Sequence, residues 1–359
     1  MKDNGALGVM LTTEPAIVGD KLSRVTNGEI WGVVESDLDF AYNNISPTHQ
    51  ALPATAHNNS FYISKAAVQA IRARMYVYRG NYTLAAQYAQ SAISESGLGL
   101  SIATPIPGGA VGSPAWNTQF YNVAGGTSPY RRMLVDFVNA PGTPNTDENI
   151  FKLSRPATGT GGIAGLWTTN TTDYQGAPWW TLGLNVYNAI TSLPNDIRRY
   201  AFIDPTSKDN FWVIDKYPGK GTTVLKNDIK MFRISEMYLI LAEAAAQSNL
   251  TQAANYVRQV RQARVYSGTV TAPVYATKVE ALRDILKERR VELVLEGHRY
   301  IDLKRLGQEA GVGIDRNAND DWVSSSTPLT LSVTDYRFTL PIPATEIAGN
   351  PGIQQNTGY

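Results

Sequence analysis

Two stretches of small apolar residues at helical spacing constrain this chain more than any other feature. In the first, residues 64–96, apolar positions recur every three or four residues on both sides of Gly80-Asn81-Tyr82. This spacing predicts a helix hairpin whose facing alanines let the two helices approach closely. Gly80 suits the left-handed conformation that ends a helix, and Tyr82 is placed to cover the turn.

A second hairpin is predicted later in the chain from the same pattern. Its helices are residues 228–247 and 250–265, separated by Ser248-Asn249, and Thr251 is expected to cap the second helix. Further amphipathic helices are predicted at residues 27–45, 278–296 and 299–306, the last two separated by Gly297. Helix pairs of this kind bury their apolar faces against neighbouring pairs. We therefore expect a mainly α fold, a tetratricopeptide-like scaffold of helix hairpins with few short strands.

The region between the hairpins has a different composition. Residues 100–228 are rich in Gly, Pro, Asn, Thr and aromatic residues and show no sustained helical period. A structureless loop of this length is uncommon in a compact domain, so a loop-rich sub-domain on the scaffold is expected. The predicted division is a helical part at 1–99, an irregular recognition part at 100–228, and a helical part with an extended tail at 229–359. Together they are expected to form one integrated unit.

Composition excludes several classes of function. The net charge is +1, so no global field attracts nucleic acid or an anionic membrane. With no cysteine and only three histidines, thiolate chemistry and a multi-histidine metal centre are not expected. No apolar run is long enough to span a membrane, and the first residues lack the features of a signal peptide. The chain is therefore either cytoplasmic or lacks a targeting segment that was removed or left out.

A charged helix near the C-terminus admits two interpretations. Glu288, Glu292 and Glu296 stand four residues apart and share one helical face. They could form an acid–base centre with His298, but glycoside hydrolysis needs two carboxylates on opposite sides of the bond. The favoured interpretation is that the three glutamates clamp arginines and tie the helix to its neighbours, with His298 as a packing residue. The arginines expected to return charge to this row are Arg290, Arg299 and Arg305.

Aromatic and short polar residues gather in the middle region, where they have the chemistry of a sugar-binding surface. Sugar rings stack on aromatic faces, and sugar hydroxyls need short polar partners. The main candidates for ligand binding are Trp167, Asn170, Asp173, Tyr174, Trp179 and Trp180. Trp116 and Tyr121 form a second candidate pair. The alternative is that these rings hold together a sub-domain that lacks regular layers.

Two weaker patterns also lie in this region. The glycine-rich sequence at residues 159–165 lacks the Lys-Ser/Thr and the preceding strand of a phosphate-binding loop, so it is interpreted as a loop. Asp147 and Glu148 could contact calcium, but they lack the ligand order of an EF-hand and are expected in a solvated turn. No cofactor is predicted.

Several segments together resemble the SusD/RagB family. They are "RISEMYLILAEA" (233–244), "VRQVRQAR" (257–264), "ERRVELVLEGHRYIDLKRLG" (288–307) and the terminal "LPIPATEIAGNPGIQQNTGY" (340–359), together with the first hairpin. The ending differs from the family pattern Gln-Asn-Pro-Gly-Tyr in having Thr357 at the proline. Family members also carry well over a hundred residues, including a lipidated cysteine, before the segment that the start of this chain resembles.

The resemblance implies a function. The expected activity is non-catalytic binding of oligosaccharide at the cell surface of a Bacteroidetes-type bacterium, and delivery to a SusC-like TonB-dependent transporter. Attachment to the outer membrane would use a lipid anchor on a segment absent from this chain. A peptide-binding member of the family is the first alternative, and a glycoside hydrolase is the second.

Overall fold

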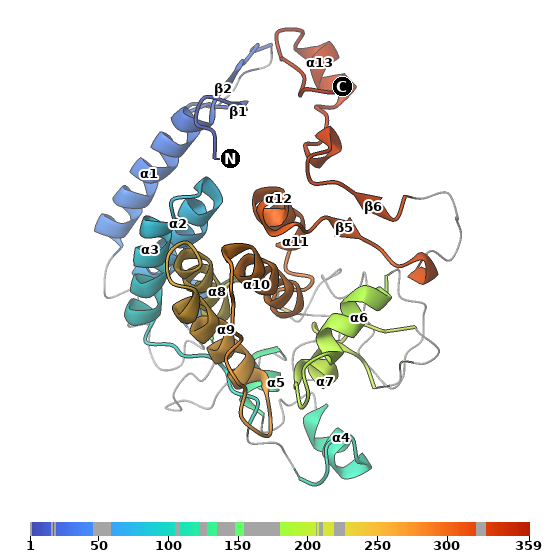
Figure 1. The fold of residues 1–359 in the computed structure, drawn as a ribbon. Helices are drawn as coiled ribbons and strands as arrows, with labels where there is room; N and C mark the ends of the chain where they lie inside the picture. The colour runs from blue at the N-terminus through green and yellow to red at the C-terminus, as the bar shows by residue number, and fades with distance from the viewer. Residues whose placement is uncertain are drawn as a thin grey trace.

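The computed structural model describes the chain at residues 2–15, 17, 19–45, 59–104, 108–121, 128–134, 148–153, 180–205, 207, 211–218, 227–320 and 328–359. Within these ranges the protein is mainly helical, and its strands pair only in short two-stranded sheets (Figure 1). This confirms the predicted fold class. Among the residues described, none of the helices combines the length and apolar character that crossing a bilayer requires.

The first predicted hairpin is confirmed as α2 (Lys65–Arg79) and α3 (Tyr82–Ser96). Ser64 caps α2 by accepting the Ala67 N–H, and Asn81 caps α3 by accepting the Leu84 N–H. Gly80 ends α2 with φ +78°, a left-handed conformation in which a Cβ would be strained. The hairpin turn thus follows from residues that are local in sequence.

The second hairpin consists of α8 (Ile234–Ala245) and α9 (Leu250–Arg264), and two details of its prediction were wrong. Residues 229–233 form strand β4, antiparallel to β3 (Asn149–Leu153), instead of the first turns of α8. Their backbone groups pair with a strand about eighty residues away in sequence, which no local pattern reveals. The cap of α9 is Asn249, whose side chain accepts the Gln252 N–H, and not Thr251.

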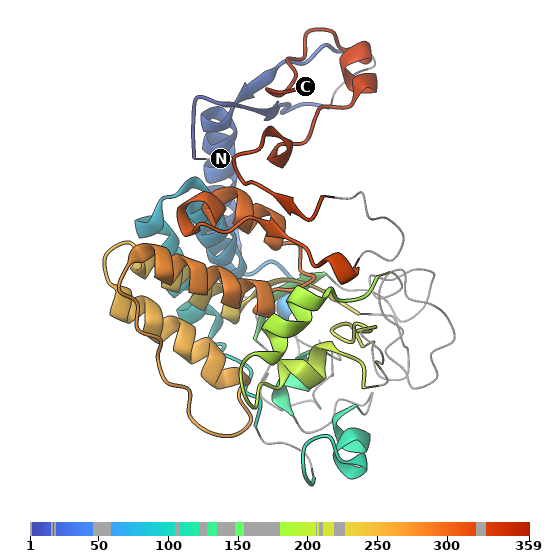
Figure 2. The same ribbon diagram turned by 45° about the vertical axis from the view of Figure 1, so that its right-hand side comes forward.

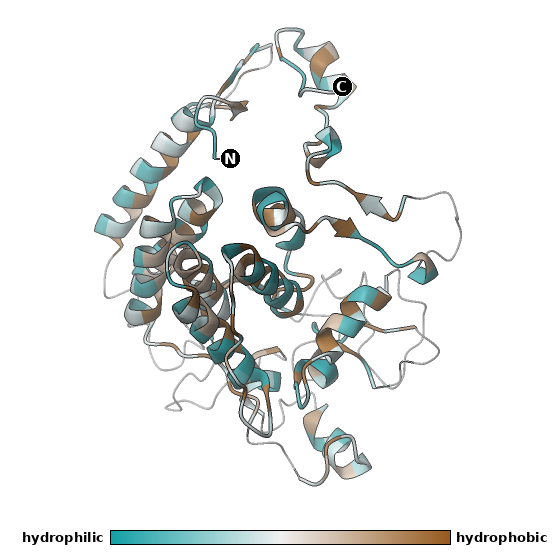
Figure 3. Cartoon of the chain, in the orientation of Figure 1, coloured by the Kyte–Doolittle hydropathy of each residue, from teal (hydrophilic) through white to brown (hydrophobic). Residues whose placement is uncertain are grey.

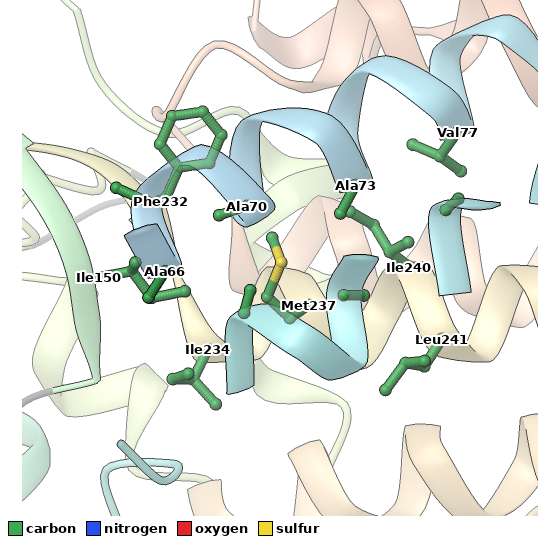
Figure 4. Close-up of a cluster of buried hydrophobic side chains, with 14 residues drawn as sticks. Ala66, Ala70, Ala73, Val77, Ile150, Phe232, Ile234, Met237, Ile240 and Leu241 are labelled. Carbon is green, nitrogen blue, oxygen red and sulfur yellow. The ribbon is translucent and has the colours of Figure 1, made fainter. Parts of the chain in front are cut away.

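The main core lies where α2 and α3 meet α8 (Figure 4). The facing positions of the first hairpin are alanines with little or no exposed surface: Ala66, Ala67, Ala70, Ala73, Ala85, Ala89 and Ala92. Met237 and Ile240 of α8 fill the space against them. Small residues on one side and large ones on the other give close packing without voids. Truncation of Met237 or Ile240 to alanine would cost about 2–5 kcal/mol.

Helix α1 (Asn27–Asn44) extends the stack on the far side of α2 (Figure 1). It begins with a capping box in which Thr26 and Glu29 satisfy each other's backbone N–H groups. Leu38 of α1 packs in one cluster with Val68 and Met75 of α2. Figure 3 shows hydrophilic and hydrophobic positions alternating along the scaffold helices, as expected when each helix buries one face against its neighbour.

Helix α10 (Lys278–Glu292) stacks against α8 and α9, and it ends one turn earlier than predicted. Leu295 has φ +64° and Gly297 has φ +82°, so the backbone leaves the helical conformation before residue 296. The chain then re-enters a helical path through α11 (Arg299–Asp302), a π-helical turn (Leu303–Gly307) and α12 (Gln308–Ala310). These elements correspond to the helix predicted at residues 299–306.

The described part of the middle region contains short helices. They are α4 (Pro114–Phe120), α5 (Pro129–Leu134), α6 (Leu184–Thr191) and α7 (Arg198–Phe202). Their apolar side chains share a second core cluster that reaches Val291 of α10. Figure 2 shows α6 and α7 beside α10. The division of the chain into three parts remains a prediction.

The C-terminal tail runs from the body back to the start of the chain (Figure 1). It contains strands β5 (Ile314–Asp315) and β6 (Thr330–Leu331), 3-10 turns at Ala318–Asp320 and Tyr336–Phe338, and helix α13 (Ala344–Gly349). The end of the tail contacts the N-terminal hairpin, which consists of β1 (Leu7–Met10) and β2 (Arg24–Thr26). Asn350 Nδ2 donates to the Leu22 carbonyl at 2.8 Å, and Arg24 Nη1 donates to the Gln354 carbonyl at 3.0 Å.

Candidate ligand-binding site

Most of the predicted aromatic cluster lies outside the described residues. This is so for Trp167, Asn170, Asp173, Tyr174 and Trp179, and also for the glycine-rich sequence at 159–165. Trp180 is described, and its exposed fraction of 63% is large for a tryptophan. Trp180 is therefore the predicted residue around which a site can be built.

Trp180 lies just before a segment that contacts further aromatic rings. Two residues after it, Leu182 forms an antiparallel bridge with Trp212, and the Leu182 N–H donates to the Trp212 carbonyl at 2.9 Å. The Trp212 indole stacks on the Tyr187 ring of α6, with centroids 3.7 Å apart and planes 8° apart. Phe211, next to Trp212, is 40% exposed. We call Trp180, Tyr187, Phe211 and Trp212 the aromatic edge.

Polar groups from the C-terminal part of the chain border the aromatic edge. Asp320 Oδ1 accepts the Leu184 N–H at 2.9 Å, so it caps α6, whose own N-cap Gly183 offers no side chain. A Cβ on Gly183 would lie 2.6 Å from Asp320 Oδ2, so a larger residue here would require the Asp320 side chain to shift. One residue further on, Asn185 Nδ2 donates to the Asp315 carboxylate at 3.2 Å. The arrangement places carboxylate and amide groups beside stacked rings.

This combination has the chemistry that sugars require. Aromatic faces cover the C–H face of a pyranose, and carboxylate or amide oxygens accept hydrogen bonds from hydroxyls. Sequence reasoning found Trp180 but missed Tyr187, Trp212 and the polar residues of the tail. The Phe211-Trp212 pair was a visible aromatic signal, whereas the contribution of residues 315–320 depends on a contact distant in sequence.

The second predicted pair, Trp116 and Tyr121, lies in the core of the middle region. The Trp116 ring has no exposed surface and stacks on Phe120 at 4.4 Å. The Tyr121 hydroxyl donates to the Tyr200 carbonyl at 2.9 Å, and burial raises its pKa. This geometry favours a structural role for both residues, which corresponds to the alternative interpretation of the aromatic clusters.

The row of glutamates on the charged helix faces inward and meets basic side chains. Glu292 has no exposed surface and accepts from Arg264 at 2.9 and 3.0 Å, from Arg233 at 2.7 Å and from Arg198 at 3.1 Å. Arg264 ends α9, Arg233 ends β4 and Arg198 starts α7. The glutamate therefore joins three elements to α10.

The neighbouring glutamates extend this buried network. Glu288 accepts from Arg198 at 2.6 Å and from Arg261 at 2.7 Å. Glu296 pairs with Arg233 at 2.7 Å and with Lys216. The clamp was predicted, but its partners were not. Of the three arginines expected there, Arg305 binds Asp302 and Glu243, and Arg299 donates to the Leu286 carbonyl. Burial lowers the pKa of Arg290, and the nearby Asp315 opposes this shift.

The network does not have the electrostatics of a hydrolytic pair. Burial by itself would raise the pKa of each glutamate, but the adjacent cations outweigh it. They lower the pKa of Glu288, lower that of Glu292 well below its usual range, and lower that of Glu296 to about 2. A general acid requires the opposite shift. His298 is buried as predicted, and its pKa is lowered by burial.

The network also corrects the prediction that Glu148 lies in a solvated turn. Glu148 is not in a solvated turn: it has no exposed surface, and Arg264 Nη2 lies 2.9 Å from its Oε2. Arg233 also donates to it. The carboxylate is neutralised by arginine and has no need of a cation. Asp147 lies outside the described residues, and in the ranges described no group of three or more acidic or histidine side chains forms a candidate metal site.

Comparison with known sequences matches the C-terminal part of the chain to one family. Residues 195–359 match the model of the SusD family. A SusD-like protein of Formosa agariphila is 32% identical over 173 residues, which are 46% of this chain and 32% of that protein. The starch-binding protein SusD of Bacteroides thetaiotaomicron is 30% identical over 154 residues, which are 40% of this chain and 24% of that protein. The matched segments thus span less than a third of either relative.

Solved structures share the fold over nearly the whole chain. A putative sugar binding protein of Bacteroides vulgatus matches with a TM-score of 0.70 and 24% identity, covering 100% of this chain and 72% of that one. A laminarin binding SusD-like protein matches with a TM-score of 0.57 and 19% identity, covering 98% of this chain and 74% of that one. The common fold therefore includes the described middle region as well as the helical scaffold.

Proposed function

Because the chain belongs to the SusD family, we propose that it is a non-catalytic cell-surface protein that binds oligosaccharides and delivers them to a TonB-dependent transporter. In this proposal a lipid anchor attaches the protein to the outer membrane. The relatives described as binding starch and laminarin support a neutral glucan as the ligand. Capture requires stacking and hydrogen bonds only, and no bond is broken.

The aromatic edge is the observation that carries the proposal. Trp180 exposes 63% of its surface two residues before Leu182, which bridges to Trp212 of the Tyr187–Trp212 stack. Asp315 and Asp320 bring carboxylate oxygens to the start of α6, the helix that carries Tyr187. An exposed indole ring offers an apolar face on which the C–H face of a sugar can stack. If a sugar covers roughly 60 Å² of this ring, the contact is worth about 1.5 kcal/mol. That corresponds to about a tenfold change in affinity.

Calorimetric titration with malto-oligosaccharides and laminari-oligosaccharides tests the proposal. We expect binding by the unaltered protein and about tenfold weaker binding by Trp180→Ala. Phe40→Ala is the matched control, because Phe40 is 71% exposed on α1, away from the aromatic edge. It should leave the affinity unchanged. Equal affinity in Trp180→Ala and the unaltered protein would refute the site.

The same material separates the two alternative functions. Incubation of the protein with each oligosaccharide should release no reducing ends. Turnover that depends on the protein would identify it as a glycoside hydrolase. Binding of oligopeptides, without binding of any glycan, would identify the peptide-binding member of the family.

A further inference from the structure

A polar groove of about 410 Å³ lies at the opposite end of α6 from the aromatic edge. Its walls are the turn after α6, the loop after α9, and α10, which lie together in Figure 2. We propose that this groove is a second ligand site that binds a hydroxylated carboxylate, the chemical class of a sugar acid. A volume of this size suits one or two sugar rings.

The acidic side chains of the groove already accept hydrogen bonds from protein donors at both carboxylate oxygens. Glu288 accepts from Arg198 through Oε1 and from Arg261 through Oε2. Asp284 accepts from Arg261 at 2.8 Å through Oδ1 and from the Tyr275 hydroxyl at 2.6 Å through Oδ2. Both carboxylates are therefore neutralised by donors from the protein.

In contrast, two basic side chains of the groove have hydrogen-bond donors without a partner among the described residues. Arg261 uses its Nε and Nη2 atoms for Glu288 and Asp284, so its Nη1 has no partner in the described part of the chain. Its side chain is 15% exposed. Lys287 also lines the groove, is exposed, and makes no ion pair with any described residue. A groove with occupied acceptors and unused cationic donors selects an anion, and a carboxylate matches the guanidinium geometry.

Hydroxyl groups line the facing wall. They come from Ser267, Thr269 and Thr271 in the loop after α9. Asn195 fixes this loop: its Nδ2 donates to the Ser267 carbonyl at 3.0 Å, and its own carbonyl accepts the Tyr266 N–H at 3.0 Å. Asn195 has φ +59°, a left-handed conformation that asparagine tolerates better than most residues. The wall is thus held in place before a ligand arrives, and its hydroxyls suit those of a sugar.

The test is a titration of the protein with galacturonate, galactose and acetate. Galacturonate should bind with a dissociation constant on the order of 1 mM, and galactose and acetate at least tenfold more weakly. Lys287→Gln should weaken galacturonate binding at least fivefold, and added salt should weaken it further because the contact is exposed. Lys278→Gln, the same substitution on the same helix, should leave it unchanged.

Several outcomes would overturn the proposal. Equal binding of galacturonate and galactose would show that the carboxylate is not recognised, and equal binding of acetate would show that the hydroxyls are not. Equal effects of Lys287→Gln and Lys278→Gln would place the ligand elsewhere. Trp180→Ala should not change galacturonate binding; a loss would assign the sugar acid to the aromatic edge and refute a second site.

Discussion

Arg264 and Glu292 form an ion pair of 2.9 Å in which both side chains are 0% exposed. Burial of such a pair is tolerated because the partners are shared. Arg264 also binds Glu148, and Glu292 also binds Arg198 and Arg233. A buried charge costs several kcal/mol when its partner is lost, because the remaining charge cannot return to water. We therefore expect loss of one member of the pair to destabilise the protein.

Glu292→Gln should lower the free energy of unfolding by about 3–5 kcal/mol, measured by urea denaturation, because three arginines lose a shared negative charge. Glu309→Gln is the control, since it removes an exposed ion pair with Lys278 in which the side chains are 36% and 39% exposed. That change should cost at most about 1 kcal/mol. A similar small loss in both variants would contradict the structural role of the network.

Stability should fall in acid because of Glu296 and Asp302. Burial would raise both pKa values, but Arg233 and Lys216 lower that of Glu296, and Arg289 and Arg305 lower that of Asp302, each to about 2. Since the folded pKa values lie below the ordinary values of 4.5 and 3.8, the stabilisation is complete above those ordinary values and is lost as the pH falls toward 2.

Urea titrations at pH 7 and pH 3 should show a joint loss of about 3 kcal/mol from these two groups. In Glu296→Gln, which cannot titrate, the loss between the two pH values should be about 2 kcal/mol smaller. An unchanged difference would mean that Glu296 is not ion-paired in the folded protein.

Truncation of Trp116 should lower the stability of the protein strongly, whereas truncation of Trp180 should not. Trp116→Ala removes a ring that is fully buried between Phe120 and Tyr200, so it should lower stability by about 3–5 kcal/mol. Trp180→Ala removes an exposed ring and should change stability by less than about 0.5 kcal/mol. Thermal denaturation measures both. A large loss of stability in Trp180→Ala would make that residue part of the core and remove the basis of the aromatic edge.

The start of α9 offers a prediction about capping. Asn249→Ala should destabilise the protein by about 1 kcal/mol, because the side chain that accepts the Gln252 N–H is lost. Thr251→Ala is the control and should be nearly neutral, since Thr251 is exposed within the first turn of the helix. The reverse order in a urea titration would restore the original assignment of Thr251 as the cap.

Local chemistry in the sequence predicted the elements well. The first hairpin follows from alanine spacing and from Gly80, whose φ of +78° is as expected for a helix end. Helical periodicity predicted an ionic clamp and places Glu288 and Glu292 on one face of α10, whereas Glu296 lies beyond the end of the helix and joins the same network through Arg233. In each case the determining residues lie within a few turns of one another.

Contacts distant in sequence were not predictable in the same way. The spacing of Arg290, Arg299 and Arg305 suggested partners for the glutamates, whereas Arg198, Arg233 and Arg264 arrive from other elements. The local pattern of residues 229–233 predicts helix, whereas their strand conformation in β4 depends on pairing with β3. For the candidate site, an aromatic residue in a loop-rich region gives no local signal of burial, so Trp116 and Trp180 were indistinguishable by sequence alone.

The buried network also has a consequence for how the chain folds. Its side chains come from before β3, from the end of β4, from α7, from α9 and from α10, so the set spans residues 148–296 and no single element contains it. A partly assembled intermediate would have to dehydrate some charges before their counterions arrive, which is unfavourable. Assembly of these segments should therefore be concerted, with α10 docking late and the interior charges losing their water in a single cooperative step.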